Sequence, residues 1–180
     1  MVEKLKAEHG AEVEWRPFFL RPDTPEEGME LPAYVRSRMA GAQERLKQMA
    51  RAIGLEMVTP IRIPNTRRAH EATEFAREHG KGEAFHRVVF RQFYGEGKDI
   101  SRWDVLQAAA KEVGLDPGAM QREVEEGRYR AEVEAQIAEA HALGITGVPT
   151  YILNDRYAIV GAQPYEAFHQ VMAQLVAETR

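Results

Sequence analysis

The sequence contains no cysteine, and this absence excludes several kinds of chemistry within its 180 residues. Disulfide bonds, thiolate zinc sites, thiol nucleophiles and dithiol redox exchange all require cysteine sulfur. Neither an HExxH motif nor a paired ligand spacing occurs among the six histidines, at positions 9, 70, 79, 86, 141 and 169. We therefore expect no metal ion and no cofactor.

Long apolar runs and a strong positive charge are also missing. No apolar run approaches the roughly 18 residues that a membrane-spanning helix needs. The first ten residues, MVEKLKAEHG, carry charges throughout, unlike a signal peptide. A net charge of -4 argues against nucleic acid as the main partner. We expect a cytoplasmic protein that binds neither a membrane nor nucleic acid.

The order of predicted elements indicates an α/β protein. A short helix over residues 2–9 precedes residues 11–20, where apolar Val13 and Trp15 alternate with charged residues and predict a strand with one buried face. Residues 32–143 show helical periodicity and almost no strand pattern. Within that block, Asn65 and Thr66 are typical of a helix cap.

The C-terminal part predicts a hairpin and a helix. Two β-branched runs, TYILN and YAIVG, meet at Asn154-Asp155, a sequence that favours a tight hairpin turn. In the helix that follows Pro164, Phe168 and Leu175 are spaced for burial against a sheet.

A helix followed by a strand is normally the second half of a βαβ unit, whose first strand lies beside the second. That first strand, its loop and the start of the helix would lie upstream of Met1, and together they would add about 20–25 residues. Completed in this way, the order is that of a thioredoxin-like sheet interrupted by an all-helical insertion domain. We expect the thioredoxin-like domain at residues 1–31 and 144–180 and the insertion at residues 32–143.

Four stretches carry a resemblance to a known family: EVEWRPFFLRPD, PNTRRAH, FYGEGKDIS and LGITGVPTYILNDRYAIVGAQP. Together they resemble the DsbA-like thioredoxin superfamily, and most closely its FrnE-like branch. That branch neighbours the kappa-class glutathione transferases and the 2-hydroxychromene-2-carboxylate isomerases. Redox members carry a CxxC after the first strand, and transferase-like members usually a serine. This chain has no counterpart of that segment, so we assign no catalytic residue.

The resemblance implies a ligand-binding role for four residues. It places Val148 and Pro149 in a cis-proline loop, where the residue before proline offers its N–H and C=O to an extended peptide or to glutathione. It places Asn65 and Thr66 where isomerase and transferase relatives line the ligand cleft. Simpler roles stay open for all four, because a proline can begin a strand and Asn-Thr can cap a helix.

Three functions remain open at this stage. The chain is a truncated thiol–disulfide oxidoreductase whose full-length product carries the CxxC, or a glutathione-dependent isomerase or transferase with a serine in its place. Alternatively, it is a non-catalytic peptide-binding module. In that third case the gap in the sheet must be filled, and a second copy of the chain in a homodimer could fill it.

Overall fold

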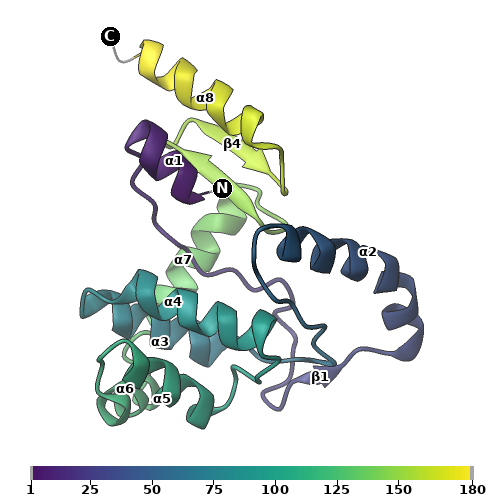
Figure 1. Ribbon diagram of the computed structural model, residues 1–180. Coiled ribbons are helices and arrows are strands. Elements are labelled where there is room, and N and C mark those ends of the chain that lie inside the picture. Colours follow the sequence, from purple (N-terminus) through teal and green to yellow (C-terminus); the bar gives the residue numbers. More distant parts are fainter. Residues whose placement is uncertain (1, 179–180) are drawn as a thin grey trace. The chain divides into compact units, whose positions relative to one another are not determined.

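The computed structural model describes residues 2–178, and the chain divides into two compact units (Figure 1). Unit 1 comprises Met1–Leu20 and Gln136–Arg180, and unit 2 comprises Arg21–Ala135. The predicted domain boundaries, after residues 31 and 143, differ from these limits and stay a prediction. None of the described helices is both long enough and apolar enough to cross a membrane.

Unit 1 is built on one β-hairpin and two helices that lie next to it (Figure 1). Its complete elements are α1 (Val2–His9), β3 (Thr150–Leu153), β4 (Tyr157–Val160) and α8 (Tyr165–Glu178). The strands pair antiparallel, and Asn154 and Asp155 between them have φ angles of 49° and 54°. Positive φ at both central residues defines a type I′ turn, which matches the twist of paired strands. The predicted hairpin is confirmed.

A small apolar core joins the elements of unit 1. Leu5 of α1, Ile159 of β4 and Phe168 of α8 are buried together. The ring of Tyr151 packs edge-on against Phe168, with ring centroids 4.7 Å apart. Phe168 and Leu175 are both buried, as the spacing predicts.

The strand predicted over residues 11–20 does not form. The two sheets of the described residues are β1–β2 and β3–β4, and this segment belongs to neither. Trp15, expected on a buried face, is 41% exposed. The physical reason is that a strand forms only where a neighbour satisfies its backbone donors and acceptors. Alternating side chains by themselves supply no such neighbour.

Unit 2 is mainly helical. Its elements are β1 (Met29–Glu30), α2 (Ala33–Ala52), β2 (Arg62–Ile63), α3 (Arg67–Glu78), α4 (Gly82–Phe90), the π-helical turn η1 (Arg91–Gly95), α5 (Trp103–Glu112), α6 (Pro117–Glu125) and the start of α7 (Arg130–Ala142). The block expected to be all-helical therefore contains one short strand, β2, which pairs with β1 across only two residue pairs.

The core of unit 2 lies among α3, α4, α5 and α6. Phe75, Phe85, Leu106 and Met120 have almost no exposed surface there. Helix α2 differs, because none of its residues is buried. Its apolar side chains Tyr34, Leu46 and Met49 are all largely exposed.

Candidate functional site

The loop before β3 holds two of the predicted site residues, both in unit 1. The Val148–Pro149 peptide bond is cis, and both side chains are exposed. Two hydrogen bonds fix the loop on either side of Val148. The carbonyl of Pro149 accepts from the Gly161 amide at 2.8 Å, and Thr150 Oγ1 donates to the Gly147 carbonyl at 2.8 Å.

Val148 presents unpaired backbone to solvent. It is 52% exposed, and no described residue pairs with its N–H or C=O. Strand β3, which starts two residues later, pairs with β4 on one side only within the described chain. An extended chain could therefore pair with this loop and the free edge of β3 through main-chain hydrogen bonds.

Asn65 and Thr66 lie in unit 2, immediately before α3, and they play different roles. Asn65 Oδ1 accepts from the Arg67 amide at 3.0 Å, and Asn65 Nδ2 donates to the Thr24 carbonyl at 2.8 Å. Thr66 occupies the N-cap position, but its side chain makes no capping hydrogen bond. The predicted cap is thus provided by Asn65, whereas the half-buried hydroxyl of Thr66 has no hydrogen-bond partner among the described residues.

Asn65 also lines a pocket of about 530 Å³ within unit 2, which we call the charged pocket. The side chains that define its chemistry are Asn65, Arg67, Arg68, Glu71, Trp103 and Arg130. Three guanidinium groups and several carboxylates meet there beside one indole ring.

The arginines of the charged pocket are held by partners from other elements. Arg67 Nη1 lies 3.0 Å from Glu134 Oε1 at the start of α7. Arg68 pairs with Glu26, donates to the Ser101 carbonyl at 3.2 Å and lies over the Trp103 ring. These contacts fix the guanidinium groups in place and leave the pocket nearly balanced in charge.

Glu71 is the exceptional residue of the charged pocket, and sequence reasoning did not identify it. Only 2% of its surface is exposed, and its Oε1 has no hydrogen-bond partner among the described residues. Arg130 Nε lies 3.6 Å from that oxygen. Burial raises the pKa of Glu71, and the positive charges of Arg130 and Arg67 counteract that rise. In the sequence, Glu71 looks like any exposed glutamate on a helix. No sequence pattern therefore indicates that this residue is buried.

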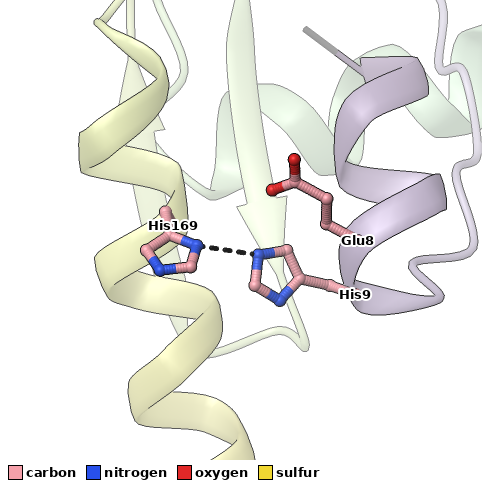
Figure 2. A group of neighbouring side chains, drawn as sticks. All are labelled: Glu8, His9 and His169. Atoms are coloured by element: carbon pink, nitrogen blue, oxygen red, sulfur yellow. Dashed lines mark hydrogen bonds between the residues drawn. The ribbon is translucent and has the colours of Figure 1, made fainter.

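One further cluster could hold a metal ion. Glu8 and His9 at the end of α1 meet His169 of α8, as Figure 2 shows. Spacing rules missed this group because His9 and His169 are 160 positions apart. The hydrogen bond from Tyr165, the largest cause, lowers the pKa of Glu8.

A family model for the DSBA-like thioredoxin domain matches residues 1–173. The chain belongs to this family. Its fold is accordingly a DsbA-like thioredoxin fold, in which helices dominate and the sheet is small. The resemblance inferred from the sequence motifs is confirmed at this level.

Individual relatives agree with the family assignment. The chain is 35% identical over 167 residues to the uncharacterized protein YwbO of Bacillus subtilis (strain 168), covering 90% of this chain and 81% of YwbO. It is similar in structure to a probable DsbA oxidoreductase from Streptomyces coelicolor, with 27% identity and a TM-score of 0.88 over 98% of this chain and 82% of that one.

A second solved structure shares the fold alone. It is 2-hydroxychromene-2-carboxylate isomerase, with 19% identity and a TM-score of 0.79 over 99% of this chain and 88% of that one. The family is therefore one of DsbA-like oxidoreductases, with an isomerase among the structural neighbours, and this chain contains no cysteine.

Proposed function

We propose that this chain is the ligand-binding part of a DsbA-like thiol–disulfide oxidoreductase and that it takes an extended peptide at the loop of Val148 and Pro149. The observation that carries the proposal is the unpaired, exposed backbone of Val148 beside the free edge of β3. Membership of the DSBA-like family supports it. Any redox thiol must come from outside these 180 residues, because none of them is cysteine. The chain alone should therefore show no dithiol-dependent disulfide reduction.

Backbone pairing gives this proposal a direct test. A short peptide is titrated into ¹⁵N-labelled protein, and amide shifts are followed in residues 147–153. The control is the same peptide N-methylated at alternate residues, which removes donors without changing the side chains. Shifts confined to this loop and β3, with clearly weaker binding of the N-methylated peptide, are expected. Equal binding of the two peptides, or no shifts at this loop, would overturn strand addition.

The charged pocket favours a second candidate, a glutathione-dependent isomerase or transferase. Glutathione carries two carboxylates and one ammonium group, which suit the guanidinium groups of Arg67 and Arg68 and the buried carboxylate of Glu71. Asn65 lines this pocket, and the unpartnered hydroxyl of Thr66 lies beside it in sequence. Amide shifts on adding reduced glutathione that fall on residues 65–71, and are absent at residues 147–153, would favour this candidate over the peptide-binding one.

Our proposal also includes a homodimer, membership of the FrnE-like branch and a cytoplasmic location. In this proposal, unit 2 is the helical insertion domain. The exposed apolar side chains of α2 support a homodimer, and light scattering after gel filtration tests this. Met49→Glu on α2 should convert a dimer to a monomer, whereas Glu44→Gln on the same helix should not. A wild-type monomer at 100 µM would exclude the homodimer at that concentration.

A further inference from the structure

Two histidines from different helices direct ring nitrogens at each other in unit 1. His9 Nε2 lies 3.1 Å from His169 Nδ1, and the ring centroids are 5.1 Å apart (Figure 2). As a hydrogen bond, this contact requires one nitrogen to hold a proton and the other to accept it. Two imidazole nitrogens bound to one tetrahedral zinc ion at 2.0–2.1 Å would be about 3.3 Å apart. The observed N–N distance is close to that value, and zinc binding would require both rings to turn so that their lone pairs point at one ion rather than at each other.

A carboxylate completes a set of three ligands. Ligand atoms of Glu8, His9 and His169 all lie within 4.8 Å of one another. The Glu8 side chain is exposed, so it has room to rotate toward the two imidazole nitrogens. The hydroxyl of Tyr165 donates to Glu8 Oε2. Such an outer contact is the usual means by which a ligating carboxylate is oriented.

The space next to the cluster leaves room for a fourth ligand. Glu8 and His169 line a surface hollow of about 350 Å³ together with Lys4, Tyr165 and Glu166. A water molecule entering from this hollow would complete a four-coordinate site. One charge opposes a cation here, because Lys4 Nζ lies 3.7 Å from Glu8 Oε1 and over the Tyr165 ring.

We propose that Glu8, His9 and His169 bind one Zn²⁺ ion with a water in the fourth position. Two imidazoles and one carboxylate suit zinc, whereas Mg²⁺ and Ca²⁺ prefer sites made of oxygen alone. The ion would join α1 to α8, two helices whose shared core contains few buried residues. This site is independent of the peptide-binding loop and of the charged pocket.

The direct test measures zinc in untagged protein by equilibrium dialysis and elemental analysis. We expect one Zn²⁺ per chain, with affinity reduced at least about tenfold in His9→Gln, in His169→Gln and in Glu8→Gln. His141→Gln and Glu139→Gln are matched controls: an exposed histidine and an exposed acidic residue of the same unit, both outside the hollow. Both should bind zinc within about twofold of wild type.

Two further readouts make the outcome decisive. Zinc should raise the melting temperature of the wild type, EDTA should reverse the rise, and His169→Gln should show neither effect. The melting temperatures in EDTA show whether each variant is folded. Lys4→Gln should tighten zinc binding, because the competing ammonium is gone. No zinc at micromolar free concentration, or unchanged binding in a His9→Gln/His169→Gln double variant, would overturn the proposal.

Discussion

Glu71 and Arg130 face each other with Oε1 and Nε 3.6 Å apart, but they differ sharply in exposure. The Glu71 side chain is 3% exposed and the Arg130 side chain 56%. The pair therefore costs the desolvation of one carboxylate without the gain of a fully buried ion pair. If Glu71 became neutral, Arg130 would keep its contact with water.

We predict that Glu71→Gln raises the free energy of unfolding at pH 7 by about 1 kcal/mol, because it removes a buried carboxylate whose desolvation the exposed Arg130 offsets only in part. Since the folded-state pKa of Glu71 lies above its ordinary value, the wild type gains stability relative to the variant as pH falls through that pKa. The difference should therefore shrink between pH 7 and pH 4. Urea denaturation across this range measures it. The control Glu44→Gln, which changes an exposed residue of α2 outside the charged pocket, should alter stability by less than about 0.5 kcal/mol. A Glu71→Gln protein less stable than wild type at pH 7 would contradict the prediction.

Because His86 is half-buried, we predict that the protein loses stability in mild acid. Burial, the largest cause, lowers the pKa of His86 from 6.5 to about 4. Between pH 6.5 and pH 4 the unfolded chain binds a proton at His86 that the folded chain does not bind. The free energy of unfolding is therefore highest above pH 6.5 and falls as the pH drops toward 4. The full shift corresponds to at most about 3 kcal/mol.

The variant His86→Gln should flatten this part of the pH profile, measured by guanidinium denaturation at half-unit steps. His141→Gln, which changes an exposed histidine, should leave the slope as in the wild type. Identical slopes for wild type and His86→Gln would show that this ring does not control the acid response.

Variants of Asn65 and Thr66 should show whether each residue caps α3 or binds a ligand. Asn65→Ala removes two hydrogen bonds at the start of α3 and should lower the free energy of unfolding by about 1–2 kcal/mol. Thr66→Val removes a hydroxyl without a partner among the described residues and should change stability by less than about 0.5 kcal/mol. Thermal unfolding and glutathione titration, run on both variants, distinguish the roles. Unchanged glutathione affinity in Thr66→Val would remove Thr66 from the ligand site.

Two phenylalanines near each other in sequence should differ strongly in their contribution to unit 2. Phe85 is fully buried in α4, whereas Phe90 at the end of α4 is 48% exposed. Phe85→Ala should cost about 3–5 kcal/mol through a cavity in the core. Phe90→Ala should cost about 1 kcal/mol or less. Denaturant titration followed by circular dichroism compares them, and equal losses would mean that the core of unit 2 is misassigned.

The sequence by itself determined the local features of this protein. The positive-φ residues Asn154 and Asp155 fix the hairpin turn, and Asn65 caps α3, because these effects depend on interactions within a few residues. The spacing of apolar side chains likewise determined the burial of Phe168 and Leu175. Family motifs added what local physics could not, namely the DsbA-like thioredoxin fold.

Only the tertiary structure decided the features that depend on distant partners. Residues 11–20 have the alternation of a strand but no pairing neighbour in the described sheets, so they form none. Glu71 of α3 is buried in a pocket that residues of α5, α6 and α7 also line, so its burial depends on elements distant in the sequence. His9 and His169 come within 3.1 Å only because α1 and α8 pack together. Periodicity describes one element at a time, whereas burial, pairing and ligand geometry arise between elements.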